Sequence, residues 1–316
     1  MAETISSIEY KEQKELFGLL ENSLKRSKEI WIEIQSRTDA TMVLKDGTFG
    51  DLGGDQEVKA DVMMGRNLTE YLSGLPNVAE VITEEGTYSE AKSGDYTAFI
   101  DPLDSSANAI RTLERLRLEL PSSQHDLPFG TVISLARNKG TTINDVVGAG
   151  FIRQDTGYSY IAVKGLGFYI VEPDGGQVKV ELSRIESQPR TLSDLLKNGW
   201  TLWTENYYPE TRTVVNDKLL GPNEKGYIRS QGCGANEQVT VAAGEAAAYF
   251  CTTAKLHEPA ASVLMVNEAG GVAVNPFTME DVVSLPLRES FRTQKYPLLL
   301  AINRELAEDF NRRLLK

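Results

Sequence analysis

The chain has 316 residues, and 33 lysines and arginines stand against 45 aspartates and glutamates, so its formal net charge is −12 and its pI is near 4.9. This acidic balance argues against a protein that binds a nucleic-acid polymer, because such proteins present a basic face to the phosphate backbone. A hydrophobic fraction of 41% is ordinary for a globular protein, the length favours two packed domains, and no apolar run is long enough to cross a bilayer.

The first half of the chain is predicted to form two helices followed by a sheet. Leu16, Leu20 and Leu24 recur at helical spacing and predict an amphipathic helix. A Gly- and Asp-rich stretch at 38–57 predicts a loop or loose hairpin, and a second helix is predicted over 61–72. The β-prone runs that follow, several of them separated by Gly-bearing turns typical of an antiparallel sheet, lie at 78–83, 96–100, 131–136, 146–151, 158–163, 168–171 and 178–182.

After about residue 190 the pattern changes to an alternation of strands and helices, which indicates an α/β layer. Strands are predicted at 200–205, 227–230, 247–251, 272–274 and 298–302. Helices are predicted at 211–220, 235–243, 259–269 and 303–315. We therefore expect an α+β fold with an antiparallel sheet in its N-terminal half and an α/β layer in its C-terminal half. The predicted domains are residues 1–185 and 186–316.

Any metal site in this chain is expected to use oxygen ligands. The chain has only two cysteines, Cys233 and Cys251, and two histidines, His125 and His257. These four residues build neither a Cys-rich zinc knuckle nor a His-based zinc site. Hard divalent cations are the metals that oxygen ligands favour.

Three acidic residues follow predicted strands. Glu84 opens a Glu-Glu-Gly sequence after the run at 78–83, and Asp101 and Asp104 follow the run at 96–100. The carboxyl ends of strands are places where loops build sites on a rigid support. Glu-Glu-Gly alone is more often a solvated turn, so this signal is weak by itself.

Two further acidic residues lie at predicted helix starts. Asp61 begins the second helix, and an aspartate at that position is most often a cap. Glu258 directly precedes Pro259, and proline is favoured at the first position of a helix. Glu258 is therefore predicted to be the N-cap of a helix that Gly270 and Gly271 close.

The segment 101–108, which reads Asp-Pro-Leu-Asp-Ser-Ser-Ala-Asn, combines two carboxylates with the start of a predicted helix. Pro102 is expected to stop the strand and to place Asp101 and Asp104 on the same side of a tight turn. Ser105 and Ser106 then open a helix whose free N–H groups can hold an anion. Carboxylates repel an anion unless cations lie between them, so the segment predicts divalent cations, Mg²⁺ foremost, beside a phosphate.

This segment resembles the Asp-Pro-(Ile/Leu)-Asp-Gly-(Thr/Ser) signature of the inositol monophosphatase-like phosphatases, which are Mg²⁺-dependent, lithium-sensitive and belong to the fructose-1,6-bisphosphatase superfamily. Other motifs of that family appear in the same order: Glu-Glu-Gly at 84–86, a glycine hairpin at 157–168, Arg-Ser-Gln-Gly at 229–232 and Glu-Ala-Gly-Gly at 268–271. The resemblance implies a layered αβαβα sandwich of the sugar-phosphatase type. It also implies Mg²⁺-dependent hydrolysis of a phosphate monoester on a small sugar, polyol or inositol phosphate.

The resemblance assigns roles to individual residues, and it gives most metal ligands to the first predicted domain. The first ion is expected on Glu84, Asp101, the carbonyl of Leu103 and the neighbourhood of Glu85. The second is expected on Asp101, Asp104 and Glu258, and a third, weaker ion on Glu84 and Asp61. An activated water, oriented by Ser106 and Asp61, is expected to attack phosphorus in line, so the catalytic residues are Asp61, Ser106 and Glu84. Ser105, Ser106 and Cys251 are the predicted substrate-binding residues.

The chain also departs from the family pattern. His257 and Glu258 replace the family's Trp-Asp, so the expected ligand is one methylene longer, as in the fructose-1,6-bisphosphatases. Ser105 replaces a glycine. Cys251 stands where the inositol enzymes present a glutamate to the inositol hydroxyls, and the segment 111–128 looks longer than the inositol-type loop. These last two differences argue against myo-inositol monophosphate as the substrate.

Several alternatives remain open from the sequence. Within the superfamily, the chain is also compatible with a fructose-1,6-bisphosphatase-like or nucleotide 3′-phosphatase activity. A catalytically silent regulator that binds a sugar phosphate is the non-enzyme alternative, although its sequence is expected to lose the metal carboxylates. A nucleophilic Asp-x-Asp-x-Thr and a kinase Gly-Lys-(Ser/Thr) loop are both absent from the sequence.

The cofactor, partners and location complete these expectations. We expect two or three Mg²⁺ ions, with Mn²⁺ as a substitute, and a small phosphorylated metabolite as the binding partner. We expect no nucleic-acid polymer and no membrane as partner, and a homo-oligomer, most simply a dimer. The first residues lack the basic and apolar stretches of a secretory leader, so we expect a cytoplasmic protein.

Overall fold

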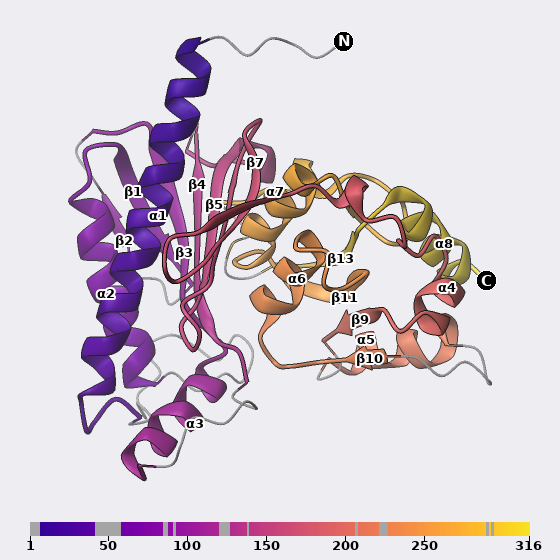
Figure 1. Ribbon diagram of the computed structural model, residues 1–316, viewed down its shortest axis with the longest axis horizontal. Helices are drawn as coiled ribbons and strands as arrows, with labels where there is room; N and C mark the ends of the chain where they lie inside the picture. Colours follow the sequence, from indigo (N-terminus) through magenta and orange to yellow (C-terminus); the bar gives the residue numbers. More distant parts are fainter. Residues whose placement is uncertain are drawn as a thin grey trace.

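The computed structural model describes residues 7–41, 58–84, 88–90, 93–119, 127–137, 139–205, 208–220, 227–288, Phe291 and 294–316. In these ranges the chain forms the predicted α+β fold, in which helical layers alternate with two mixed sheets (Figure 1). Most of the predicted loop at 38–57 lies outside the described residues, as do Glu85, Gly86 and residues 120–126.

The first sheet has eight strands in the order β2-β1-β3-β4-β5-β6-β7-β8. All neighbouring pairs are antiparallel, as predicted, except β1 and β3, which are parallel. The exception arises because β2 turns back along the outer edge of β1, and the chain then continues on the other side of β1. Strands β1 and β3 therefore end at the same edge of the sheet. The strands are β1 (Val78–Thr83), β2 (Tyr88–Glu90), β3 (Tyr96–Asp104), β4 (Gly130–Ala136), β5 (Val146–Arg153), β6 (Ser159–Val163), β7 (Gly167–Val171) and β8 (Gln177–Val180).

Helices α1 (Ser7–Gln35) and α2 (Lys59–Ser73) cover one face of this sheet, which confirms the two helices predicted for the start of the chain (Figure 1). The leucine stripe of α1 is fully buried against the sheet. At Gly150 of β5, an added Cβ would lie only 2.9 Å from Leu24 Cδ1, so the glycine allows the close approach of helix and strand. The burial of this stripe is the main stabilising contribution of α1.

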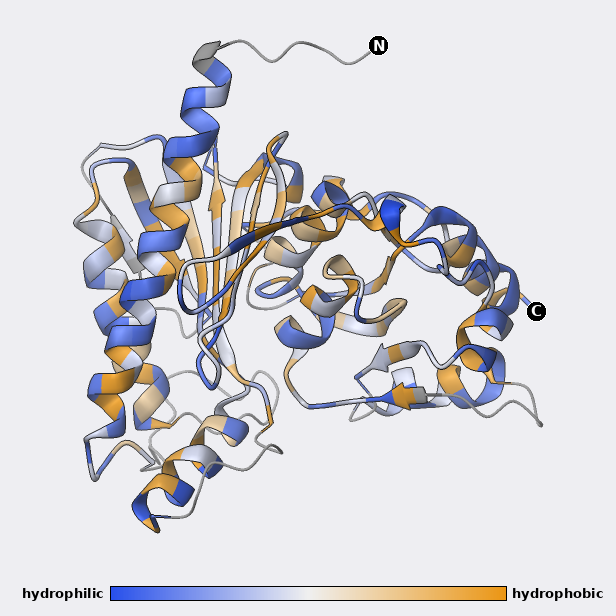
Figure 2. Ribbon diagram, in the orientation of Figure 1, coloured by the Kyte–Doolittle hydropathy of each residue, from blue (hydrophilic) through white to orange (hydrophobic). Residues whose placement is uncertain are grey.

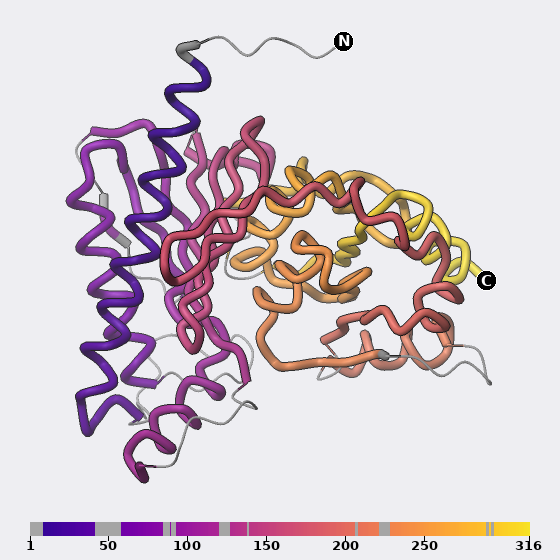
Figure 3. Tube along the Cα trace, viewed as in Figure 1, coloured from indigo at the N-terminus to yellow at the C-terminus, as the bar shows by residue number. Residues whose placement is uncertain are grey.

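Helices α6 (Gly234–Ala242) and α7 (Pro259–Ala269) lie between the two sheets and contact both. The second sheet has the order β10-β9-β11-β13-β12, with β9 parallel to β10 and β11 and the remaining pairs antiparallel. Its strands are β9 (Thr201–Thr204), β10 (Tyr227–Arg229), β11 (Ala248–Lys255), β12 (Val272–Val274) and β13 (Lys295–Ala301). The helices on its outer side are α4 (Leu192–Lys197), α5 (Pro209–Val214) and α8 (Arg304–Leu314). The stack is thus the expected αβαβα sandwich, and α1 and α8 lie at its opposite ends (Figure 3).

Two hydrophobic cores fill the spaces between the layers. One lies between α1, α2 and the first sheet, and the other extends from the opposite face of that sheet through α6 and α7 to the second sheet and α8. In Figure 2 the strands of the first sheet are mainly hydrophobic, whereas α1 and α8 carry long hydrophilic stretches. Because the second core takes residues from both halves of the chain, its layers pack as one unit. The division into domains at residue 185 stays a prediction.

The structure differs from the predicted elements at several places. Helices α3 (Ser106–Arg117) and α4 were not predicted with these bounds, and residues 111–117 belong to α3, not to a long loop. The helix predicted at 211–220 is divided into α5 and a π-helical turn, Val215–Leu219. No helix in the described ranges combines the length and apolarity that a bilayer span requires.

Candidate active site

Most of the predicted site residues gather where β1 and β3 end and where α3, α6 and α7 begin. The backbone N–H of Glu84 donates to the carbonyl of Ile100 at 3.1 Å, so the residue after β1 is fixed to the neighbouring strand β3. Asp101 and Asp104 belong to β3 itself. Glu258 directly precedes α7, which packs against the first sheet. Three segments far apart in the sequence are thus fixed on rigid elements around one place.

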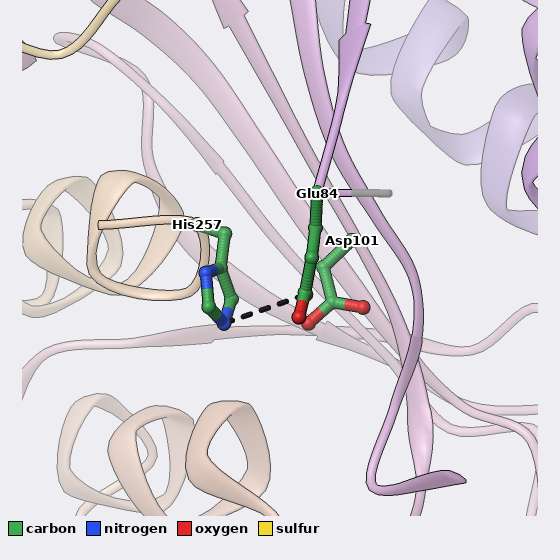
Figure 4. A group of neighbouring side chains, drawn as sticks. All are labelled: Glu84, Asp101 and His257. Carbon is green, nitrogen blue, oxygen red and sulfur yellow. Dashed lines mark ion pairs between the residues drawn. The ribbon is translucent and has the colours of Figure 1, made fainter. Parts of the chain in front are cut away.

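Two groups of side chains there offer donor atoms at metal-ligand spacing. Asp101, Asp104 and Glu258 each present an oxygen, and these atoms lie within 4.8 Å of one another. Glu84, Asp101 and His257 form a second group by the same measure, shown in Figure 4. Asp101 belongs to both groups and therefore joins them into one continuous cluster.

The backbone of β3 gives Asp101 and Asp104 their positions. We expected Pro102 to stop the strand, but β3 continues through it to Asp104. The pairing of β3 with β4 shifts register between Asp101 and Asp104, and Pro102 lies at this irregularity. Proline has no backbone N–H, but at such a position the strand pairing does not require one. Thr131 Oγ1 donates to the Pro102 carbonyl at 2.8 Å, and the Leu103 N–H donates to Asp101 Oδ1 at 3.1 Å. The irregularity therefore brings the two aspartates together without a tight turn.

Asp104 is buried and held by the start of α6. Its Oδ2 accepts a hydrogen bond from Cys233 Sγ at 2.8 Å and from the Ala235 N–H at 3.0 Å. Burial, and then the neighbouring Glu258 carboxylate, raise the pKa of Asp104 well above its ordinary value. The cluster therefore carries more negative charge than its protein surroundings neutralise.

Glu258 occupies the N-cap position that the sequence predicts, but its side chain makes no capping hydrogen bond. Its Oε2 instead accepts from Gln238 Nε2 at 2.8 Å, and Gln238 in turn accepts from the Ser262 hydroxyl. The carboxylate is thus aimed away from α7 toward α6 and the cluster. Gly270 closes α7 in the left-handed conformation, as expected.

His257 is a member of the site that the sequence interpretation missed. Its Nε2 lies 3.4 Å from Glu84 Oε2 and 3.6 Å from Glu258 Oε1, and its side chain is 6% exposed. Burial alone lowers the pKa of an imidazole, but Glu84 and Glu258 outweigh it and raise the pKa of His257 to about 9. Its position next to Glu258 in the sequence was the available signal.

Ser105 and Ser106 open α3 beside the cluster, as predicted. Ser105 is the N-cap residue and adopts φ 68°, ψ 57°, the left-handed region in which glycine is free of strain. This conformation explains why a glycine suits the position. Ser106 Oγ donates to the Leu103 carbonyl at 3.4 Å. The Asn108 N–H already donates to the Ser105 carbonyl at 3.0 Å, so the N–H groups that precede it are the ones that an anion would use.

Asp61 caps the start of α2, and Cys251 lies inside the second sheet. Asp61 is buried in the first turn of α2, where its Oδ2 accepts from the Val58 N–H at 3.2 Å; among the described residues, neither metal-ligand group includes it. Cys251 has no exposed surface and lies in β11, with its Sγ 3.5 Å from Glu205 Oε2. The thiol therefore packs against protein groups in this structure, and its contact with a substrate stays a prediction.

The donor set fits a pair of divalent cations. Buried carboxylates with like charge are costly unless a cation lies between them, and the raised pKa of Asp104 expresses that cost. Oxygen atoms at these separations match the ligands that Mg²⁺ prefers. Asp101, Asp104 and Glu258 would hold one ion, and Glu84 and Asp101 would hold another.

A family model described as the inositol monophosphatase family matches residues 12–304 of this chain. The chain belongs to the inositol monophosphatase family. The resemblance that the motifs indicated is thereby confirmed, and the chain is a member of a phosphatase superfamily. All the residues of the cluster lie within the matched range.

Several known proteins are similar to this family member. The Nus factor SuhB of Pasteurella multocida (strain Pm70) is 26% identical over 192 residues, which span 61% of this chain and 61% of that relative's length. The holo form of Leishmania major fructose-1,6-bisphosphatase superposes with a TM-score of 0.66 at 17% identity and covers 95% of both chains. An IMPase/NADP phosphatase complexed with Mg²⁺ and phosphate superposes with a TM-score of 0.64 at 14% identity, again over 95% of both chains. These likenesses confirm the fold.

Proposed function

We propose that this family member is a metal-dependent phosphatase that hydrolyses a phosphate monoester on a small sugar, polyol or inositol. The observation that carries the proposal is the pair of metal-ligand groups that share Asp101 beside the N-terminus of α3. We propose Mg²⁺ as the cofactor, as two or three ions with Mn²⁺ as a substitute. The oxygen-rich donor set supports Mg²⁺, as does the Mg²⁺ complex of the IMPase/NADP phosphatase neighbour.

The mechanism follows from the slowness of phosphate-ester hydrolysis in water, which leaves catalysis to charge neutralisation and positioning. Divalent cations held by the carboxylate cluster would supply positive charge that activates water and stabilises the leaving oxygen. The N–H groups of Ser105 and Ser106 hold the phosphate at the N-terminus of α3. By family resemblance, Ser106 and Asp61 orient the attacking water, and Glu84 serves the first cation position.

Two of the competing functions differ from the proposed one in their substrate, and the third is a protein without turnover. A fructose-1,6-bisphosphatase-like or nucleotide 3′-phosphatase activity would use the same carboxylate cluster, with different residues lining the substrate pocket. Since Cys251 is buried, it gives no argument for choosing among these substrates. A silent sugar-phosphate-binding regulator is less well supported, because Glu84, Asp101 and Glu258 keep their carboxylates within the cluster.

The test is phosphate release from a substrate panel in the presence of Mg²⁺, Mn²⁺ or excess EDTA. The panel contains myo-inositol 1-phosphate, fructose 1,6-bisphosphate and a nucleotide 3′-phosphate. We expect turnover with either cation and none with the chelator. Full turnover in EDTA would overturn the proposal of metal dependence. Lack of turnover on every substrate, with the cations bound, would favour the regulator.

Asp104→Asn is the variant that tests the cluster directly. It removes one charge from a crowded set of carboxylates, so we expect a loss of turnover of about 10²-fold or more with the fold retained. Asp217→Asn, at an exposed position of the π-helical turn, is the matched control and is expected to keep its rate. A near-native rate for Asp104→Asn would show that the cluster is assigned wrongly.

Further properties are proposed from the family resemblance alone. They are inhibition by Li⁺, a homodimeric assembly and a small phosphorylated metabolite as the natural ligand. Titration of activity with Li⁺ and light scattering of the purified protein measure the first two.

A further inference from the structure

We propose that His257 is a nitrogen ligand of the cation held by Glu84 and Asp101, and that this ligand raises the affinity of the site for Mn²⁺ more than its affinity for Mg²⁺. The inference rests on the proposed function, because it concerns the same metal cluster. It assigns to this chain a mixed nitrogen and oxygen site in place of the oxygen-only site that its low histidine content predicted.

The geometry places the imidazole among the carboxylates. Figure 4 shows the His257 ring directed at Glu84, with Asp101 behind it. Nε2 lies 3.4 Å from Glu84 Oε2, and one donor atom from each of the three side chains falls within 4.8 Å of the others. Donor atoms around one octahedral ion with bonds of about 2.1 Å are separated by roughly 3 to 4 Å. Small side-chain adjustments therefore suffice to bring all three onto one cation.

The ring is held in this orientation by its surroundings. Phe291 packs edge-on against it, with ring centroids 6.2 Å apart and an interplanar angle of 79°. The residue is buried, so the imidazole has little freedom to turn away. Nδ1 is also buried and makes no hydrogen bond among the described residues, which leaves Nε2 as the nitrogen presented to the carboxylates.

The chemistry of the ligand determines the metal preference. Mg²⁺ is the harder cation and gains little from an imidazole ligand. Mn²⁺ also favours oxygen ligands, but it opens the transition-metal series whose later members imidazole suits, so it gains more from a nitrogen ligand than Mg²⁺ does. A ligating imidazole is neutral, so cation binding releases the Nε2 proton of His257 to the solvent. Carboxylates from Glu84 and Asp101 serve either ion, so the difference in affinity between the two ions is expected to come from His257. Removal of the imidazole is expected to weaken Mn²⁺ binding more than Mg²⁺ binding.

The test is pulsed electron paramagnetic resonance of the full-length protein loaded with less than one equivalent of Mn²⁺. We expect ¹⁴N modulation from a directly bound imidazole in the wild-type protein and its loss in His257→Gln. The chain has two histidines, so His125→Gln is the matched control and is expected to keep the modulation. Labelling the unsubstituted protein with ¹⁵N-histidine should replace the ¹⁴N pattern with a ¹⁵N pattern, which tests the ligand without any substitution.

Isothermal titration with Mn²⁺ and with Mg²⁺ gives the second measurement. His257→Gln is expected to raise the Mn²⁺ dissociation constant by about 10-fold or more and the Mg²⁺ dissociation constant much less. Mn²⁺ that binds without histidine modulation, or equal losses for both ions, would overturn this inference and leave the proposed phosphatase standing. Wild-type protein that binds neither ion would instead contradict the proposed function.

Discussion

Gly234 is the position where a single methyl group is expected to disable the site without harming the fold. It is the first residue of α6, and a Cβ added to it would lie 2.0 Å from Glu258 Oε2 and 2.6 Å from Glu258 Cδ. The carboxylate of Glu258 therefore occupies the space that any side chain at 234 needs. Gly234→Ala must displace Glu258 from the cluster that it forms with Asp101 and Asp104.

The magnitude follows from the distances. Ordinary van der Waals contact begins near 3.4 Å, so Glu258 Oε2 must retreat by 3.4 − 2.0 = 1.4 Å. A misplacement of about 1 Å in an active site costs on the order of 10²-fold in rate, so we expect a loss of about that size in kcat/KM. The displaced atoms are the end of a flexible side chain, and alanine is a better helix former than glycine by up to about 1 kcal/mol. The free energy of unfolding should therefore stay unchanged or rise slightly.

The assay is steady-state phosphate release with saturating Mg²⁺, combined with urea unfolding and calorimetric cation titration. Gly18→Ala is the matched control, since Gly18 lies within α1 and an added Cβ there meets nothing within 4 Å. This control should gain stability to a similar extent and keep full activity and cation affinity.

The result that refutes the reasoning is specific. If Gly234→Ala keeps a rate within about 3-fold of the wild type while it folds normally, then Glu258 is not needed where the structure places it. A loss of activity together with a large loss of stability would instead indicate that α6 itself moves, which the flexible end of Glu258 should prevent.

Two further predictions concern stability. Burial raises the pKa of Glu237 to about 9 from 4.5, although the N–H groups of Gln231 and Gly232 lower it. Between these values the folded protein keeps a proton that the unfolded chain releases, so stability falls as pH rises. Glu237→Gln should remove this fall. The free energy of unfolding of the variant, measured by urea unfolding at several pH values, should therefore rise relative to that of the wild type by up to about 1.4 kcal/mol per pH unit. Ser105→Gly should raise the free energy of unfolding by about 0.5 to 1 kcal/mol, because the left-handed conformation costs serine about 1 to 2 kcal/mol and glycine's extra unfolded-state entropy offsets part of the gain.

Each of these stability predictions has a control and a contradicting outcome. Glu186→Gln, at an exposed position, should leave the pH dependence of stability unchanged. Parallel pH profiles for Glu237→Gln and the wild type would show that Glu237 does not hold a proton in the folded state. A fall in stability for Ser105→Gly would show that the serine side chain contributes more than its backbone strain costs.

The sequence by itself predicted most of the elements and most of the residues that gather in the carboxylate cluster. The leucine stripe of α1 predicts its buried face, because helical periodicity depends only on local spacing. Asp101 and Asp104 were identified because carboxylates at a strand end beside a helix start have few purely structural explanations. Pro259, whose preference for the first helical position is also a local property, predicted Glu258 as a helix N-cap, and the family resemblance gave Glu258 its expected role as a ligand.

Other family motifs have a structural meaning that only the fold explains. Glu268, in the Glu-Ala-Gly-Gly sequence, accepts a hydrogen bond from the Gly165 N–H at 2.9 Å. Gly165 belongs to the turn of the glycine hairpin, which joins β6 and β7. The two motifs therefore meet where α7 packs on the first sheet, and they help to set the position of the helix that begins after Glu258.

The tertiary structure decided how these residues face one another. The parallel pairing of β1 and β3 brings Glu84 to Asp101, and the packing of α7 between the sheets brings His257 to both. The orientation of Cys251 was also decided there, since β11 lies between β9 and β13 with helices packed on both faces of the sheet. Periodicity predicts that a strand residue points to one face or the other, but only the assembled layers determine which face lines a site. Contacts between residues that are distant in the chain depend on this packing, so local sequence patterns do not predict them.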